Sequence, residues 1–206
     1  VTNYNANHLK VFNSVFRHSQ FTGLVDATDS AILSNITTVA LSFLHTPNTA
    51  GSYSFTVNFT NPIYNPHSGH NAADGGIIAS TGFYINVETS EMFFDDDGDG
   101  NLRIYHLVGA VRTYFNVSAG TVNYAKGLVS VNPIYITSVS NVDESASTAI
   151  RMTTTPNSYD IVGMRNQILE IDTLNTTITG GQDTIVAGSG SATYTTTSSY
   201  VAPSSY

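Results

Sequence analysis

Residues 53–60 read YSFTVNFT, in which every second residue is a large apolar one and the residues between them are Ser, Thr or Asn. Successive side chains of a β-strand point to opposite faces, so this alternation predicts a strand with one buried and one polar face. Strands of a parallel sheet are instead apolar on both faces. The stretch therefore predicts a mostly β protein built from antiparallel, sandwich-like sheets.

Similar patterns on both sides of this stretch extend the prediction. Alternation also occurs over residues 38–43 and 83–88, which we expect to be strands. Residues 92–108 contain a cluster of Asp and Gly between two apolar runs, and residues 121–131 contain Gly127 between two more. Such residues adopt the backbone conformations that tight turns require, so both segments are predicted to be β-hairpins.

Helix signals are few. No segment carries a long apolar stripe with the 3.6-residue period of a helix. Only residues 26–35 resemble a short helix, for which Thr28 or Asp29 would be the N-cap. We therefore expect few short helices beside the sheets.

Changes of composition divide the chain into three parts. We expect a β domain with hairpins over residues 1–140, and a smaller β subdomain or a continuation of the first over residues 141–186. Residues 187–206 are uncharged and rich in Ser, Thr and Tyr. This part is predicted to be an extended arm, and Thr and Tyr favour pairing with a sheet edge on another chain.

Composition also excludes several classes of function. Seven Lys and Arg against fifteen Asp and Glu give a net charge of -8, which disfavours nucleic acid as a partner. No apolar run approaches the roughly 18 residues of a membrane span. The chain has no Cys, which excludes disulfides, thiolate zinc sites and cysteine nucleophiles. It begins VTNYNANHLK, without Met or a signal-peptide core, so we expect a piece of a longer protein.

An acidic segment matches part of a calcium-binding loop. Asp95, Asp97 and Asp99 occupy positions 1, 3 and 5 of such a loop, and Gly100 occupies the sharp turn. The twelfth position is His106 where a bidentate Glu is needed, and the flanks alternate as strands instead of forming helices. We therefore interpret the segment as a hairpin turn whose aspartates accept local backbone hydrogen bonds.

A second cluster contains His67, His70 and Asp74. Two His and one carboxylate are the elements of a catalytic zinc or iron site, so a metal-dependent hydrolase is one alternative. The segment is rich in Pro and Gly, which predicts a loop, and loops rarely hold such a pair in place without a further ligand. We favour imidazoles that hydrogen-bond within the loop or to a neighbouring subunit.

Other catalytic signatures are missing from the sequence, which lacks a G-x-S-x-G elbow, a Walker A loop, G-x-G-x-x-G after a strand and H-E-x-x-H. We predict no enzyme activity, no catalytic residue, no metal, no cofactor and no small-molecule substrate. A carbohydrate-binding or adhesin module is the other alternative, because aromatic side chains stack on sugars and the chain has twelve Tyr, although it has no Trp.

Five segments together give the chain a family resemblance. In their order and residues they resemble the C-terminal part of the ring-forming baseplate wedge protein of T-even-type contractile-tail phages. The resemblance extends over most of residues 20–180. The segments are 25–39, 62–71 leading to 75–85, 94–107, 119–131 and 160–172.

The resemblance implies a structural role in the virion. Proteins of that family form a ring in the tail baseplate, join the wedges around the central hub, and change arrangement when the sheath contracts. It implies that this chain contacts other wedge proteins and further copies of itself, in a particle assembled in the host cytoplasm. The low charge content agrees with permanent contacts, because few charges would have to be desolvated there.

Overall fold

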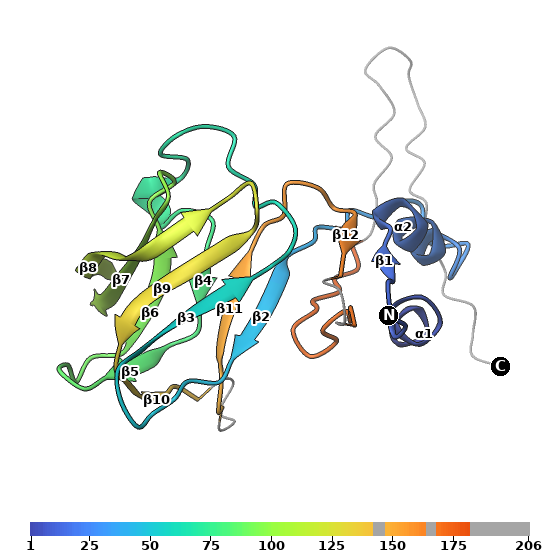
Figure 1. Ribbon diagram of the computed structural model, residues 1–206. Coiled ribbons are helices and arrows are strands. Elements are labelled where there is room, and N and C mark those ends of the chain that lie inside the picture. Colours follow the sequence, from blue (N-terminus) through green and yellow to red (C-terminus); the bar gives the residue numbers. More distant parts are fainter. Residues whose placement is uncertain (142–146, 164–167, 182–206) are drawn as a thin grey trace, which may run out of the picture.

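The computed structural model describes residues 1–141, 147–163 and 168–181, and it confirms a mostly β chain with antiparallel sheets and few short helices (Figure 1). The predicted arm, residues 187–206, lies outside the described residues. The strands are β1 (Val15–Phe16), β2 (Leu41–His45), β3 (Tyr53–Asn58), β4 (Ala79–Ser80), β5 (Phe83–Ile85), β6 (Met92–Asp96), β7 (Asn101–Val108), β8 (Val111–Asn123), β9 (Leu128–Ile134), β10 (Ile136–Val139), β11 (Ile150–Thr154) and β12 (Ile161–Val162). The helical elements are α1 (Thr2–Tyr4), a π-helical turn (Asn5–Leu9), α2 (His18–Asp26) and a 3₁₀ turn (Ala72–Asp74).

Two sheets enclose the main core. A seven-stranded antiparallel sheet has the order β10-β5-β6-β7-β8-β9-β3, and a three-stranded sheet has the order β2-β11-β4. Phe83 and Phe94 from the larger sheet and Met152 from the smaller one are completely buried in one apolar cluster. Both sheets thus contribute their apolar faces to a single sandwich core.

The alternating segments form strands, with shifted ends. Residues 53–58 form β3 as predicted, and on it Val57 is buried while Ser54 and Thr56 are exposed. β2 begins at Leu41, three residues after the start of the alternating stretch 38–43. β5 ends at Ile85, so the next apolar residue of that pattern, Val87, is exposed.

Both predicted hairpins are confirmed. β6 pairs with β7 from Met92 opposite His106 to Asp96 opposite Leu102, so the acidic segment forms the turn between them. β8 pairs with β9 up to Asn123 opposite Leu128. Gly127 has φ of +64° in that second turn, a conformation that favours glycine.

The prediction of a helix over residues 26–35 is wrong. The helix, α2, ends at Asp26, and the following residues form turns and irregular backbone. The Asp29 side chain accepts a hydrogen bond from the Ala31 N–H, and the backbone of Asp29 accepts one from Ile32. An Asp that bonds its own backbone in this way favours a turn over a continuing helix.

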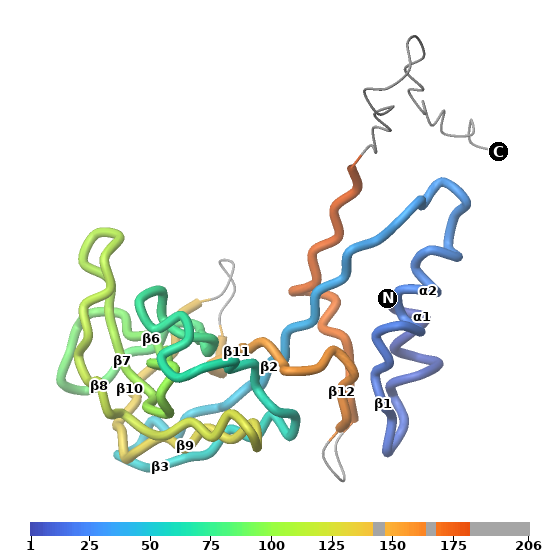
Figure 2. The backbone as a smooth tube through the Cα atoms, turned by 90° about the horizontal axis from the view of Figure 1, so that it is seen from above, coloured from blue at the N-terminus to red at the C-terminus, as the bar shows by residue number. Residues whose placement is uncertain are grey.

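The N-terminal segment, which we define as residues 1–42, lies beside the sandwich except for its last two residues, which begin β2 (Figure 2). It has a small core of its own, in which Tyr4, Leu9 and Phe16 are buried against Ile161 of β12. β1 pairs with β12 to close this unit. No helix among the described residues is long and apolar enough to cross a membrane.

Candidate interaction surfaces

The two motifs that the sequence places 30 residues apart form one structural unit. The 65–76 loop lies against the 95–101 turn, and we call the pair the joined loops. The Gly98 carbonyl oxygen accepts hydrogen bonds from the Asn65 side chain at 3.0 Å and from the Gly69 N–H at 3.2 Å. The Ser68 hydroxyl donates to the Asp99 carboxylate. Hydrogen bonds from both backbone and side chains therefore hold the two loops together.

Asp97 organises the turn itself. Its carboxylate accepts hydrogen bonds from the backbone N–H groups of Asp99, at 2.8 Å, and Asn101, at 2.9 Å. The side-chain amide of Asn101 adds a third, at 2.6 Å. Burial opposes ionisation here, but these hydrogen bonds prevail and hold the pKa of Asp97 below its usual value. The aspartate therefore accepts local backbone hydrogen bonds, as the hairpin interpretation expected.

Asp96 is the acidic residue that the sequence did not reveal as important. Its side chain is completely buried and accepts hydrogen bonds from the N–H groups of Ile77 and Ile78, each at 2.7 Å, and of Gly98, at 3.2 Å. The Tyr124 hydroxyl donates a fourth at 2.6 Å. Burial, together with this hydrogen bond to the carboxylate, raises the pKa of Tyr124. Asp96 thus links the joined loops to the β8–β9 turn.

Asp95 belongs to a buried ion pair on the other face of β6. Arg103 Nε donates to its carboxylate at 2.9 Å, and the Tyr114 hydroxyl donates to the second oxygen at 3.0 Å. The same guanidinium donates to the Asp96 carbonyl oxygen at 2.7 Å and lies 4.3 Å from the centre of the Tyr114 ring. Burial raises the pKa of Asp95, and the Arg103 charge and hydrogen bond oppose that shift.

The three aspartates of the calcium pattern therefore face different partners. Asp95 contacts Arg103, Asp97 bonds the turn backbone, and Asp99 accepts from Ser68. Within residues 1–141, 147–163 and 168–181, no three His, Asp or Glu side chains gather as a group that could hold a metal ion.

The histidines of the loop come together without Asp74. His70 Nδ1 lies 3.3 Å from His67 Nε2, and His67 Nδ1 lies 2.9 Å from the Ser68 carbonyl oxygen. These hydrogen-bonding distances agree with the expectation that the imidazoles bond within the loop. Asp74 instead lines a cleft of about 610 Å³ together with Arg112.

Replacing Gly98 with Ala will disrupt the joined loops. Gly98 has φ of +74°, and a Cβ there would lie 2.5 Å from the His70 nitrogen and 2.7 Å from the Gly69 carbonyl carbon. We expect the free energy of unfolding to fall by about 2–4 kcal/mol, because backbone strain and steric overlap add. Urea unfolding measures the loss. Gly109→Ala is the matched control: φ is +64° but no atom lies within 4 Å, so strain alone should cost about 1 kcal/mol. If Gly98→Ala and Gly109→Ala lowered the free energy of unfolding equally, the close contact between the two loops at Gly98 would be contradicted.

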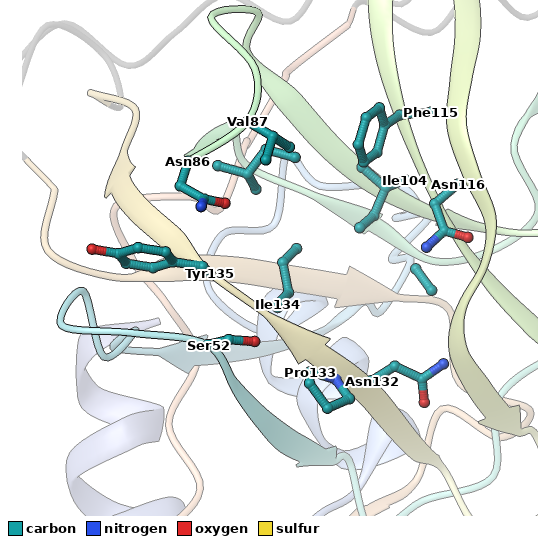
Figure 3. Close-up of a pocket in the computed structure, with 12 residues that line it drawn as sticks. Ser52, Asn86, Val87, Ile104, Phe115, Asn116, Asn132, Pro133, Ile134 and Tyr135 are labelled. Carbon is teal, nitrogen blue, oxygen red and sulfur yellow. The ribbon is translucent and has the colours of Figure 1, made fainter.

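A second cleft lies where β8 and β9 separate (Figure 3). Its volume is about 330 Å³. Phe115 and Asn116 of β8 form one side, and Asn132 and Pro133 of β9 lie across from them. All residues that line it are uncharged, namely Ser52, Ile85, Asn86, Val87, Ile104, Phe115, Asn116, Ala119, Asn132, Pro133, Ile134 and Tyr135. The cleft thus offers amide groups and apolar surface together.

The N-terminal segment leaves many apolar side chains uncovered. Ile36 is the extreme case, at 96% exposed. The large apolar residues of this segment that are exposed are Val11, Phe12, Leu24, Leu33 and Ile36. These five residues make the segment a candidate contact surface for another protein.

The same segment carries the similarity to known proteins. Residues 1–42 match the family described as baseplate structural protein gp6, C-terminal domain III. Of the five segments that carry the sequence resemblance, residues 25–39 lie within this match. Among curated proteins, none matches the chain.

The family match supports a phage baseplate protein with a structural role. It therefore supports a location in the tail baseplate of the virion and contacts with other baseplate proteins. A structural family also favours the expectation that the chain is not an enzyme.

Proposed function

We propose that this chain is a structural subunit of a contractile-tail baseplate that links wedges into a ring around the hub. In this proposal it contacts other wedge proteins and further copies of itself, and the ring rearranges when the sheath contracts. The observation that carries the proposal is the coincidence of two features in the N-terminal segment, which matches the baseplate family and leaves five large apolar residues exposed.

Charge distribution in the N-terminal segment supports a permanent contact. Its two basic residues are already paired within the chain: Lys10 lies 2.9 Å from Glu170, and Arg17 lies 3.5 Å from Asp160. The other exposed side chains of the segment are mainly uncharged, both polar and apolar, with Asp26 and Asp29 as its exposed acids. Desolvating uncharged side chains costs little free energy, and each Å² of apolar area buried contributes about 25 cal/mol to binding. These properties suit an obligate interface.

Replacing Ile36 with Asp should abolish incorporation into the baseplate without unfolding the chain. Ile36 is almost fully exposed, so the folded chain alone loses no packing, whereas a partner would have to bury the new charge. We expect at least about a tenfold loss of co-sedimentation with the other baseplate proteins of the source particle, and an unchanged thermal unfolding curve.

Thr56→Asp is the control for the added charge, because Thr56 is exposed on β3, a strand of the sandwich. Unchanged incorporation of the Ile36 variant would contradict a contact at this surface. A wild-type chain that stays monomeric with the other baseplate proteins and binds glycans would instead favour the carbohydrate-binding alternative. The cleft beside Tyr105 and Tyr114 would then be the site to test.

A further inference from the structure

One edge of β8 lacks a strand partner over most of its length. β8 spans Val111–Asn123 and pairs with β7 from Val111 to Thr121, with residues 117–119 bulged out of the register. It pairs with β9 only from Gly120 to Asn123. Among the described residues, no strand pairs with residues 111–119 on that side. In an antiparallel sheet, alternate residues direct their N–H and C=O groups to opposite edges, so this part of β8 presents backbone groups that have no strand partner. At Ser118 side chains take the place of a strand: its N–H donates to Asn116, and its carbonyl oxygen accepts from Asn132.

Irregular pairing explains why the two strands separate. The register between β7 and β8 shifts twice, between Leu102 and Ile104 and between Ile104 and Tyr105. Bulges of this kind bend a strand and increase its twist. β8 therefore diverges from β9, and the cleft of about 330 Å³ opens between them. At its inner end the Asn132 side chain donates to the Ser118 carbonyl oxygen at 3.2 Å, in place of a strand partner.

The exposed side chains of the free edge are uncharged, and three of them are large and apolar. Arg112, the charged residue of this stretch, is half-buried and lies 5.0 Å from the centre of the Tyr105 ring. Val111, Phe115 and Val117 are 68%, 42% and 62% exposed. A long exposed apolar edge is a site at which another extended chain can add as a further strand. The uncharged cleft beside it selects against charged segments, since a charge buried there would have no partner.

We propose that residues 187–206 of a second copy of this chain bind along the free edge of β8 and enter the cleft. These twenty residues have no charged side chain, are rich in Thr and Tyr, and have no Pro before Pro203. They thus match the site in charge and in strand propensity. Pairing with residues 111–119 needs only about 30 Å of extended chain, well within the reach of twenty residues. The inference rests on the proposed function, for which it names one contact between copies.

The position of the chain end favours a second copy over the same chain. The last described segment, residues 168–181, runs away from the sandwich beside the N-terminal segment, whereas β8 lies at the opposite end of the molecule (Figure 2). Residues 182–186 add at most about 18 Å. Within one copy the segment would have to run back along the molecule before it reached the edge, whereas a neighbour in a ring can present its own edge directly.

Disulfide trapping tests this contact, because the chain has no Cys of its own. Acceptor chains carry Thr113→Cys, and donor chains carry Tyr194→Cys, Thr196→Cys or Ser198→Cys. The control acceptor carries Thr121→Cys: Thr113 and Thr121 are both exposed residues of β8, but Thr121 pairs with β7 and β9. We expect at least one donor to give about fivefold or more mixed dimer with Thr113→Cys than with Thr121→Cys under mild oxidation.

Equal yields from the two acceptors would overturn the proposal. So would a disulfide that forms only within one chain when both substitutions are placed in the same copy. Co-sedimentation with the other baseplate proteins is measured on the same variants before oxidation. A chain that incorporates normally but gives no selective mixed dimer would refute this contact and leave the proposed function standing. A chain that never incorporates would refute the proposed function by itself.

Discussion

The Asp96→Ala variant is expected to lose about 3–5 kcal/mol of its free energy of unfolding, the largest loss that we expect for any acidic residue in the part of the chain that the structure describes. The Asp96 carboxylate is fully buried and accepts four hydrogen bonds, three of them from backbone N–H groups. Removal leaves those donors buried without acceptors. Each such group costs about 1–3 kcal/mol, although part of the loss is recovered when water or relaxed backbone reaches the site.

Two further variants make this prediction specific. Asp96→Asn keeps one oxygen for Ile77 and Ile78, but its amide group faces the Gly98 N–H, so we expect an intermediate loss. Asp99→Ala is the matched control in the same turn, because Asp99 is exposed and accepts only from Ser68. We expect it to lose less than about 1 kcal/mol. Urea unfolding of all three gives the comparison, and similar losses for Asp96→Ala and Asp99→Ala would show that burial of Asp96 is not what matters.

Removal of the Arg103 side chain should destabilise the fold in a pH-dependent way. Arg103→Ala leaves the carboxylate of Asp95, which is 1% exposed, without its cation, and breaking a buried pair in this way costs about 3–5 kcal/mol near neutral pH. Burial already raises the pKa of Asp95 in the folded chain, and Arg103 is the main group that opposes the shift. The pKa of Asp95 in the variant should therefore lie higher still.

The sign of the pH effect follows from linkage. A carboxyl group whose pKa is higher in the folded state than in the unfolded state favours folding below the unfolded pKa, and that contribution is lost as pH rises through the folded pKa. In the variant the folded pKa is higher, so Asp95 becomes protonated, and no longer needs a cation, at a higher pH. The free energy of unfolding should therefore differ most between wild type and Arg103→Ala at neutral pH, and the difference should shrink toward pH 4. Urea unfolding at several pH values measures it.

Tyr114→Phe provides the control for the pH effect, since it removes only the neutral hydroxyl that donates to Asp95. We expect Tyr114→Phe to lower the free energy of unfolding by about 1 kcal/mol, and this loss should change less with pH than the loss for Arg103→Ala. A deficit for Arg103→Ala that stays constant from pH 7 to pH 4 would mean that Asp95 is not the group left unpaired.

Local patterns in the sequence predicted the sheets and hairpins, because those patterns act between neighbouring residues. The alternation over residues 53–60 specifies which face of β3 is buried. Gly127 can adopt the positive φ that the β8–β9 turn requires. The helix was misplaced for a related reason. Asp29 can cap a helix or close a turn with the same hydrogen bond, and residue type alone does not distinguish the two.

The joined loops could not be predicted in the same way. The predicted hairpin turn and loop are both present, but the contact that joins them, from Ser68 to Asp99, spans 31 residues. Three of the four partners of the Asp96 side chain lie 18 to 28 residues away, so nothing in the run of aspartates distinguishes it from its neighbours. The free edge of β8 depends on two register shifts, which alternation does not encode.

The closure of the N-terminal segment has a consequence for the order in which a ribosome-bound chain can fold. The Asn5 side chain exchanges two hydrogen bonds with the backbone of Ile171, 166 residues later, and β1 waits for β12. The sandwich strands from Leu41 to Thr154 emerge before β12 and Ile171 and have a core of their own. Residues 1–42 therefore reach their final structure only after the sandwich strands have been synthesised. A contact that needs the folded form of residues 1–42 therefore cannot form before Ile171 has left the ribosome.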